Sequence, residues 1–241
     1  MVDQMPGMRM NIPLKTEIKE ILVADIVLII AFSLTLVGGI FGAGSSIGIE
    51  KLLILMPIMA VAVTLSFVLH ELMHKFSAQH YGAIAAFRTS KMGLGITLIT
   101  GIFGFLLGIP GATVIYASNF TRRENGIVSL AGPLTNFTVF AVVLAIYLLV
   151  PLPPYFALMA EITLFISILL AFFNMLPINP PHGRKVLAWN KGVYMVAMGI
   201  IFVLTGLSYY LLFGNIYAML EEVVFMIFIA FIFSMFYRGM F

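Results

Sequence analysis

Long apolar stretches dominate the chain, and short polar segments separate them. A helix needs about 20 apolar residues to cross the hydrocarbon core of a bilayer, and seven stretches have about that length. They lie at about 20–42, 52–80, 93–117, 127–150, 155–176, 193–213 and 215–237. Six of them have the pattern of membrane-crossing helices. The sequence therefore predicts an all-α, polytopic membrane protein with about six transmembrane helices.

The stretch at 93–117 differs from the other six because it is rich in glycine. It holds six glycines and Pro110, which is an unfavourable composition for a straight helix. We interpret it as a re-entrant or membrane-associated segment, and a β-hairpin is one form it could take. Irregular backbone at membrane depth must be buried in protein or line a wet cavity, because lipid cannot satisfy its amide groups. This segment therefore suggests a cavity.

The distribution of Lys and Arg supports the re-entrant interpretation. If 93–117 enters and leaves on the same side, twelve of the 13 basic residues share one face of the membrane and only Lys51 lies on the other. If the segment crossed, the split would be six against seven. The positive-inside rule favours the first arrangement. It places both termini in the cytoplasm.

The composition excludes an ordinary soluble protein and several kinds of chemistry. Apolar residues make up 62% of the chain and charged residues 10%, against about 45–50% and about 25% in a typical globular domain. The absence of cysteine excludes disulfides, thiolate zinc sites and cysteine nucleophiles. The net charge of +3 describes membrane orientation. We therefore expect contact with membrane lipid and no nucleic-acid partner.

The strongest chemical signal is the run His70-Glu71-Leu72-Met73-His74 in the second apolar stretch. Two histidines at i and i+4 share one face of a helix and can chelate one metal ion. Glu71 can hold and deprotonate a water molecule that the metal activates. Ionisable groups within an apolar span are costly and usually functional. The pattern therefore favours a metal site over two solvated histidines at a helix end.

A catalytic zinc ion needs a third protein ligand and one open position, and two further histidines compete for that role. His80 follows His70 by ten residues, as in metzincins, but Ser77 stands where that pattern needs glycine. On an unbroken helix, His80 would lie about 15 Å along the axis from His70. His182 follows a proline-rich break after the fifth stretch. Taken alone, it would more often be a loop histidine than a ligand.

Three ordered blocks resemble the site-2 protease family of intramembrane zinc metalloproteases. The family patterns are HExxHxxxAxxYG, AGPLxN and FNLLPxxPLDG, and their order and spacing are far more specific than HExxH alone. The matching blocks here are HELMHKFSAQHYG at 70–82, AGPLTN at 131–136 and FNMLPINPPHG at 173–183. The resemblance implies a single membrane-embedded metalloprotease domain over 1–241, with its catalytic core at about 60–190.

The chain departs from the family pattern at the third zinc ligand. The family uses the aspartate of LDG, and His182 stands at that position. The resemblance therefore implies one Zn²⁺ ion on His70, His74 and His182, with Glu71 as the catalytic base. A neutral third ligand would leave the site one charge more positive and make its water more acidic. An active enzyme with three histidine ligands and a degenerate relative that cuts poorly both stay open.

Two of the blocks contain residues with weaker signals. Asn174 matches a family position that faces the site, where its amide could donate to the oxyanion of a scissile peptide. It could equally cap backbone freed before Pro177. Gly132 and Pro133 predict a tight turn into a helix at 133–150. Asn136 could bond a neighbouring helix.

The sequence thus predicts an intramembrane zinc endopeptidase in a prokaryotic cell membrane, cutting transmembrane segments of substrate proteins. Its zinc site would face the cytoplasm. Two other classes stay open: a catalytically impaired pseudoprotease or metal-binding scaffold that holds partner helices, and a metal transporter. A transporter usually needs further ligands across the membrane. The other acids available in the spans are Asp25, Glu161, Glu221 and Glu222.

Overall fold

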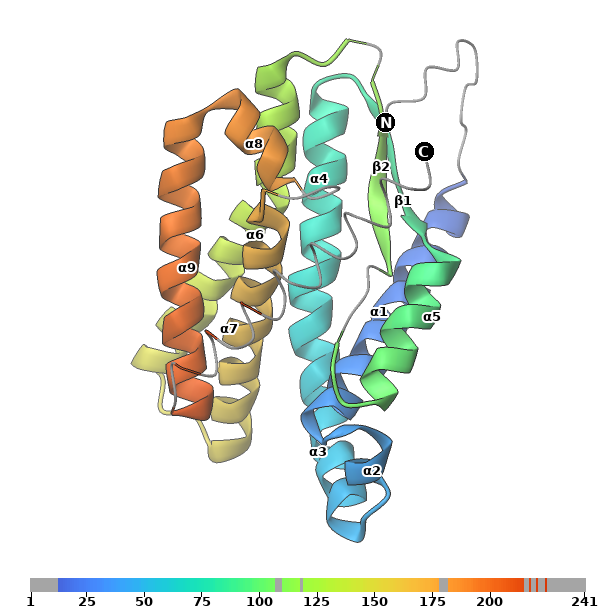
Figure 1. Cartoon of the computed structure of the whole chain (residues 1–241), viewed down its shortest axis with the longest axis vertical. Helices are drawn as coiled ribbons and strands as arrows, with labels where there is room; N and C mark the ends of the chain where they lie inside the picture. Colours follow the sequence, from blue (N-terminus) through green and yellow to red (C-terminus); the bar gives the residue numbers. More distant parts are fainter. Residues whose placement is uncertain are drawn as a thin grey trace. The chain divides into compact units, whose positions relative to one another are not determined.

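The computed structural model describes residues 13–106, 110–117, 119–177 and 182–214, together with Tyr217, Leu220 and Val224. Contacts divide the chain into two compact units, Met1–Asn119 and Phe120–Phe241. In Figure 1 the first unit runs from blue to green and the second from yellow-green to red. The predicted single domain over 1–241 stays a prediction.

The first unit combines helices with a small sheet. Its elements are α1 (Leu14–Leu36), α2 (Gly39–Ala43), α3 (Ser46–Val63), the π-helical turn η1 (Thr64–Val68), α4 (Leu69–His80), β1 (Ile84–Thr89), α5 (Lys91–Ile102) and β2 (Gly111–Tyr116). The segment from α3 through η1 to α4 is continuous over Ser46–His80, 35 residues in all. This length exceeds the roughly 20 residues that a bilayer crossing needs.

The helix that carries the histidines ends at a glycine. Gly82 has a φ of +79°, which favours glycine because the left-handed region disfavours a Cβ atom. Its N–H donates to the Gln79 carbonyl at 2.9 Å, and the Ala83 N–H donates to the Ala78 carbonyl at 3.1 Å. This pair of bonds is a Schellman motif. It turns the chain from α4 directly into β1.

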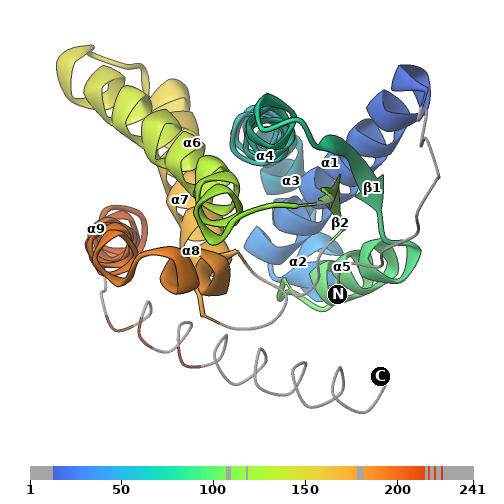
Figure 2. The same cartoon turned by 90° about the horizontal axis from the view of Figure 1, so that it is seen from above.

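Strands β1 and β2 form an antiparallel pair, with Phe87 opposite Thr113. Both strands contact α4, and β1 also contacts α1 (Figures 1 and 2). The fold is mostly helical, which is consistent with the predicted all-α membrane protein, and it adds a small two-stranded sheet. The suggestion of a β-hairpin inside 93–117 is wrong, because the partner of β2 is the strand at 84–89.

The glycine-rich segment begins as a helix in spite of its composition. The Ser90 hydroxyl caps α5 by accepting the Gly93 N–H at 3.0 Å. Gly101 packs so closely on α1 that an added Cβ would lie 2.8 Å from the Cα of Ala31. Here glycine permits close helix packing, as is typical of membrane helices. Tertiary packing thus outweighs the low intrinsic helix propensity of glycine.

The second unit consists of helices. They are α6 (Arg122–Leu149), α7 (Pro154–Met175), α8 (Gly183–Trp189) and α9 (Lys191–Phe213). Their shared core includes Phe140, Leu164, Phe172 and Ile201. α7 ends at Met175 because Leu176, with a ψ of 138°, precedes Pro177, and a residue before proline disfavours the helical conformation.

Helix α6 begins earlier than the sequence predicts. A capping box starts it: the Thr121 hydroxyl accepts the Glu124 N–H at 3.2 Å, and the Glu124 carboxylate accepts the Thr121 N–H at 2.7 Å. Pro133 lies inside this helix, so the predicted tight turn at Gly132 and Pro133 is wrong. Membrane helices tolerate an interior proline because neighbouring groups can satisfy the freed backbone.

Four helical segments among the described residues are long and apolar enough to cross a membrane. They are Ser46–His80, Arg122–Leu149, Pro154–Met175 and Lys191–Leu211. The crossing expected at 20–42 corresponds to α1, which carries five charged residues within its first twelve positions and is not among the four. The crossing expected at 215–237 lies outside the described ranges. The prediction of six crossings therefore stays a prediction.

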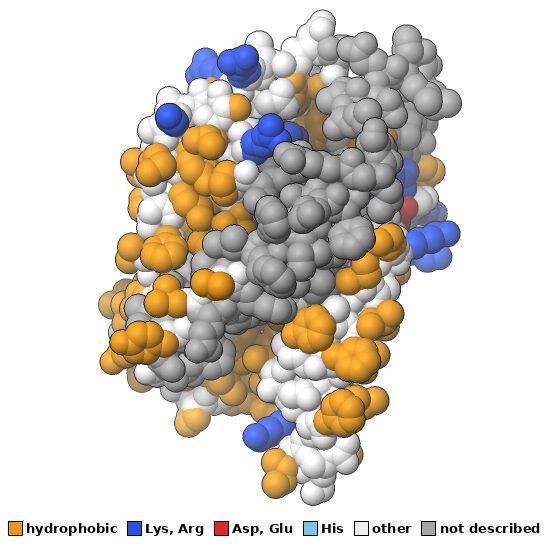
Figure 3. Space-filling model, in the orientation of Figure 1, with side chains coloured by type: hydrophobic (Ala, Val, Ile, Leu, Met, Phe, Trp, Pro, Cys, Tyr) orange, Lys and Arg blue, Asp and Glu red, His pale blue; other side chains and the backbone are white. Residues whose placement is uncertain are grey.

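The surface of the long helices is apolar. Leu53 on α3, Leu148 on α6 and Val203 on α9 are exposed by 70%, 69% and 67%, and hydrophobic side chains spread widely over the face in Figure 3. Apolar surface of this extent marks a membrane or interaction site. Together with the four long apolar helices, it describes a membrane protein.

Candidate metal centre

His70 and His74 converge on one face of α4. Both side chains are buried, and their Nε2 atoms lie 3.0 Å apart. Two nitrogens bound at about 2.0–2.1 Å to a tetrahedral zinc ion are about 3.3 Å apart. The observed spacing is close to that value, so the two imidazoles fit a single metal ion.

The π-helical turn η1 leads directly into this pair. Its first residue, Thr64, donates its hydroxyl to Oδ2 of the buried Asp25 on α1 at 2.7 Å. The Phe67 ring packs edge-on against Phe87 of β1, with centroids 5.7 Å apart. Single π-turns occur frequently at functional sites. Contacts from α1 and β1 therefore hold the turn that presents His70.

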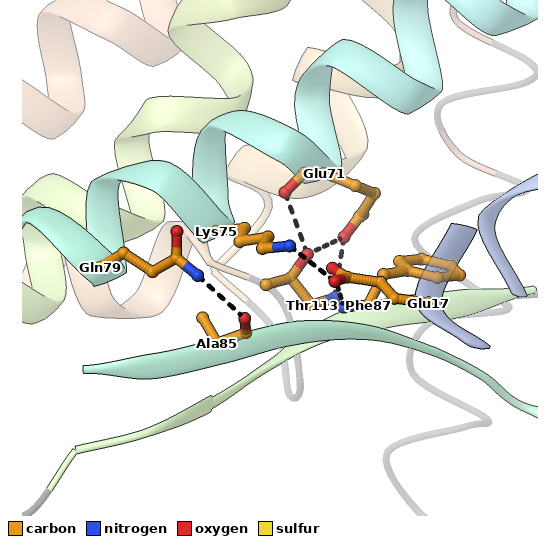
Figure 4. Close-up of polar contacts among 7 residues, drawn as sticks. All are labelled: Glu17, Glu71, Lys75, Gln79, Ala85, Phe87 and Thr113. Carbon is orange, nitrogen blue, oxygen red and sulfur yellow. Dashed lines mark hydrogen bonds and ion pairs between the residues drawn. The ribbon is translucent and has the colours of Figure 1, made fainter. Parts of the chain in front are cut away.

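Glu71, which lies between the two histidines in the sequence, accepts hydrogen bonds from Thr113 of strand β2. The Thr113 N–H and the Thr113 hydroxyl both lie 2.8 Å from Glu71 Oε2, and the same hydroxyl lies 3.0 Å from the Glu71 backbone carbonyl. Figure 4 shows these contacts between α4 and the strand. Glu71 is buried. Its carboxylate thus has a fixed orientation.

Two glutamates of α1 cap the opposite edge of the sheet. Glu17 accepts the Phe87 N–H at 3.1 Å and pairs with Lys75 of α4 at 2.6 Å (Figure 4). One turn on, Glu20 accepts the Thr89 N–H at 2.8 Å and pairs with Arg88 at 2.6 Å. Edge strands with free N–H groups invite pairing with another chain. The outer edge of β1 is therefore blocked by carboxylates.

The residues expected from the third block lie in the second unit. The Asn174 Nδ2 donates to the Leu170 carbonyl of its own helix at 2.9 Å. His182 is half-buried and precedes the first residue of α8. A side chain on the next residue, Gly183, would overlap the Met175 carbonyl oxygen. Glycine at 183 therefore lets α8 start against the end of α7, which fixes the backbone at His182.

The third metal ligand stays a prediction. Among the residues that the structure describes, no group of three or more His, Cys, Asp or Glu side chains could hold a metal ion. His182 belongs to the second unit and His70 and His74 to the first. His80 is exposed at the end of α4, with its ring against Tyr81 at 5.3 Å. Among the described residues, His70 and His74 therefore supply a preformed pair of metal ligands.

Four other polar residues of the apolar stretches were noted in the sequence, namely Asn136, Glu161, Glu221 and Glu222. Glu161 accepts the Tyr147 hydroxyl at 2.7 Å, whereas Glu221 and Glu222 lie outside the described residues. Asn136 is fully buried, and neither of its amide atoms has a hydrogen-bond partner within the described part of the chain. The expected bond from Asn136 to a neighbouring helix is therefore not seen there.

Sequence reasoning missed Thr113 and the role of Asp25. Thr113 lies 42 residues from Glu71 in the chain, inside a glycine-rich segment with no recognisable motif. Asp25 was one of several acids in the apolar stretches, and nothing in the sequence links it to Thr64, 39 residues away. A buried acid in an apolar span is a general signal for function, but it names no partner.

The fold and the site together define a helical membrane protein with the HExxH pair typical of zinc metallopeptidases. A protein of Methanocaldococcus jannaschii named "Putative zinc metalloprotease MJ0611" is 42% identical over 140 residues, which is 56% of this chain and 72% of that protein. No protein-family model and no solved structure matches the chain. At this identity and coverage the chain belongs to the same zinc metalloprotease family, which is consistent with the site-2 protease resemblance.

Proposed function

We propose that this metalloprotease is an intramembrane zinc endopeptidase of the site-2 type, which cuts transmembrane segments of substrate proteins. One Zn²⁺ ion would be held by His70, His74 and His182. The observation that carries the proposal is the buried pair of histidines with Glu71 between them, inside a continuous apolar helical segment over Ser46–His80. Such groups are rare in an apolar span unless they serve a function.

The chain's own residues supply proton transfer and positioning. When bound, zinc lowers the pKa of a water molecule and polarises the scissile carbonyl. The Glu71 carboxylate takes a proton from the water molecule while the water oxygen forms a bond to the carbonyl carbon of the substrate. Glu71 then gives that proton to the leaving amine nitrogen as the C–N bond breaks. The water oxygen thus ends on the carbonyl carbon of one product, and the proton ends on the amine nitrogen of the other.

Asn174 could assist at the carbonyl oxygen. Its amide nitrogen carries two hydrogens, and one of them is donated to the Leu170 carbonyl. The second hydrogen remains for an oxyanion, which gains from a fixed donor in a site that excludes water. This supports the role expected for Asn174 without requiring it to leave its helix.

A helical substrate must unwind before it is cut, because its carbonyls are engaged in helical hydrogen bonds. We propose that the unwound chain pairs with the outer edge of β2. β1 occupies one edge of β2, and α4 contacts this strand. Addition of a strand to an exposed sheet edge is a common way to bind an extended peptide. The outer edge of β1 is capped at Phe87 and Thr89 by two glutamates, whereas on β2 the Thr113 N–H is given to Glu71. The substrate strand would therefore pair with the part of the β2 edge next to Thr113.

The orientation in the membrane follows from the basic residues. With segment 93–117 folded back, twelve of 13 Lys and Arg side chains share one side, and this supports cytoplasmic termini and a cytoplasm-facing zinc site in a prokaryotic cell membrane. A cysteine-labelling experiment on each loop tests the orientation, since the wild-type chain has no cysteine.

The test of the proposed function is cleavage of a reconstituted substrate. The zinc-loaded protein and a single-span protein are placed in the same liposomes, and the products are identified by mass spectrometry. The proposal expects a cut within the transmembrane segment, abolished by Glu71→Gln. Cuts confined to the soluble flanks, or none by the parent, would contradict it.

The histidine at the third ligand position favours one rival, an impaired pseudoprotease. Under that alternative the parent binds zinc and is inactive, and His182→Asp creates activity by restoring the family's carboxylate. Under our proposal the parent turns over and His182→Ala loses both zinc and activity. The same liposome assay with these two variants separates the alternatives.

A further inference from the structure

The two oxygens of the Glu71 carboxylate have different surroundings. Both hydrogen bonds from strand β2 reach Oε2, at 2.8 Å each. Within the described residues Oε1 receives no hydrogen bond. A carboxylate has about four lone-pair sites, two on each oxygen, and both Thr113 donors lie on the Oε2 side. Oε1 is left as the oxygen that can exchange a proton.

We infer that Thr113 is a positioning residue for the base: it anchors Oε2 of Glu71 and so leaves Oε1 to accept the proton from water. This inference rests on the proposed function. A general base must lie within about 2.6–3.2 Å of the proton donor in the reactive geometry. A carboxylate that rotates freely would spend little of its time in that geometry. Holding one oxygen removes this freedom.

The Thr113 hydroxyl has a second contact that fixes it to the helix. It lies 3.0 Å from the Glu71 backbone carbonyl and 2.8 Å from Oε2. One hydroxyl hydrogen serves one of these acceptors at a time, while the backbone N–H of Thr113 holds Oε2 throughout. The side chain therefore spans the backbone and the carboxylate of the same residue. It ties the strand to a single point on α4.

The strand itself is held from its other side. Thr113 faces Phe87 in the register, and the Phe87 N–H donates to Glu17, which pairs with Lys75 of α4. Glu71 and Lys75 are four residues apart and so lie on the same face of the helix. The contacts form a closed ring through α4, β2, β1 and α1 (Figure 4). This ring keeps Thr113 in place when the hydroxyl is removed.

The two variants that test the inference separate the hydroxyl of Thr113 from its methyl group. Thr113→Val keeps the branched shape and strand preference, and Thr113→Ser keeps the hydroxyl. Thr97→Val is the matched control. Thr97 is also a buried threonine of the glycine-rich segment 93–117, but its hydroxyl donates to the Gly93 carbonyl of its own helix α5 at 2.8 Å. Zinc content, kcat and KM are measured for each in liposomes.

We expect Thr113→Val to lower kcat at least tenfold, with KM and zinc content within twofold of the parent. Thr113→Ser should keep at least half of the parent kcat, as should Thr97→Val. The split between kcat and KM separates positioning from a structural role, because a damaged fold would also lose zinc. A Thr113→Val protein with parent kcat, or a Thr113→Ser protein as slow as Thr113→Val, would overturn the inference.

A second measurement needs no activity. In the metal-free protein, thermal unfolding midpoints are compared for Thr113→Val, Glu71→Ala and the double variant. If the hydroxyl acts on Glu71, the double variant loses less than the sum of the single shifts, whereas Thr97→Val combined with Glu71→Ala is additive. Additive shifts at Thr113 overturn the inference. A parent that cleaves nothing, with coupled shifts, would contradict the proposed function and leave the contact established.

Discussion

Phe87 and Thr113 lie opposite each other in the two-stranded sheet, and each donates its backbone N–H outward to a glutamate on a helix. This is the arrangement of a non-hydrogen-bonded antiparallel pair, in which both N–H groups point away from the partner strand. Phe87 donates to Glu17 on α1 and Thr113 to Glu71 on α4. The sheet is therefore anchored on both edges, and one anchor is the predicted catalytic base.

The anchor on α1 should matter for stability. Glu17→Ala removes the partner of both Lys75 and the Phe87 N–H, and the pair is buried, with side-chain exposures of 13% and 5%. Leaving one member of a buried ion pair without its partner costs about 3 kcal/mol or more. We expect a lower midpoint of thermal unfolding in detergent.

Glu20→Ala is the matched control for this prediction. The Glu20–Arg88 pair is more exposed, at 23% and 32%, so its loss should cost about 1 kcal/mol or less. Equal destabilisation by the two substitutions would show that burial of the Glu17 pair is not what makes it important.

Alanine substitutions at two glycines, Gly82 after α4 and Gly95 inside α5, should change the stability of the protein in opposite directions. Gly82 has a φ of +79°, so Gly82→Ala should destabilise the protein by about 1 kcal/mol. Gly95 lies inside α5, and an added Cβ there meets no atom within 4 Å. Gly95→Ala should stabilise by about 0.5–1 kcal/mol. Thermal unfolding of both variants in one detergent tests the pair, and equal shifts would contradict it.

Zinc binding should depend on three of the four histidines. His70→Ala, His74→Ala and His182→Ala should each lose most of the bound zinc, whereas His80→Ala keeps it, because His80 is exposed at the far end of α4. Metal analysis of the purified variants measures this directly. Retention by His182→Ala with loss by His80→Ala would reverse the ligand assignment.

Removal of the metal should lower stability. A ligand that binds only the folded state stabilises it in proportion to the logarithm of its concentration over Kd. Treatment with a chelator should therefore lower the unfolding midpoint of the parent, and added zinc should restore it. The His70→Ala variant serves as the control, and an equal response to chelator in this variant would show that the effect arises elsewhere.

The sequence predicted the features that depend on local pattern. Four of the apolar stretches correspond to helices long enough to cross a membrane, HELMH lies on one of them, and α7 ends where Pro177 disfavours its continuation. The three motifs predicted a zinc metalloprotease family, which the archaeal relative confirms. Each of these signals is contained within a few residues of the chain, so no knowledge of long-range contacts was needed.

Two of the three errors came from contacts that the local pattern does not contain. The glycines of 93–117 predicted an irregular segment, but its first part belongs to helix α5, where Gly101 packs closely on α1. Thr113 reaches Glu71 only because β2 pairs with β1 beside α4. Pro133 predicted a helix start, yet α6 continues through it from the capping box at Thr121. Tertiary packing decided the first two, whereas the Thr121–Glu124 capping box that starts α6 is a local signal in the sequence.

The central claim is that Glu71 serves as the base of a zinc endopeptidase, and its most direct test compares cleavage rates at equal zinc content. The parent and Glu71→Gln are loaded with zinc, reconstituted with one transmembrane substrate and followed to product. We predict turnover by the parent and a loss of at least about 100-fold in the variant, the usual contribution of a general base. A parent that holds zinc and cleaves nothing, or a variant as fast as the parent, would contradict the claim.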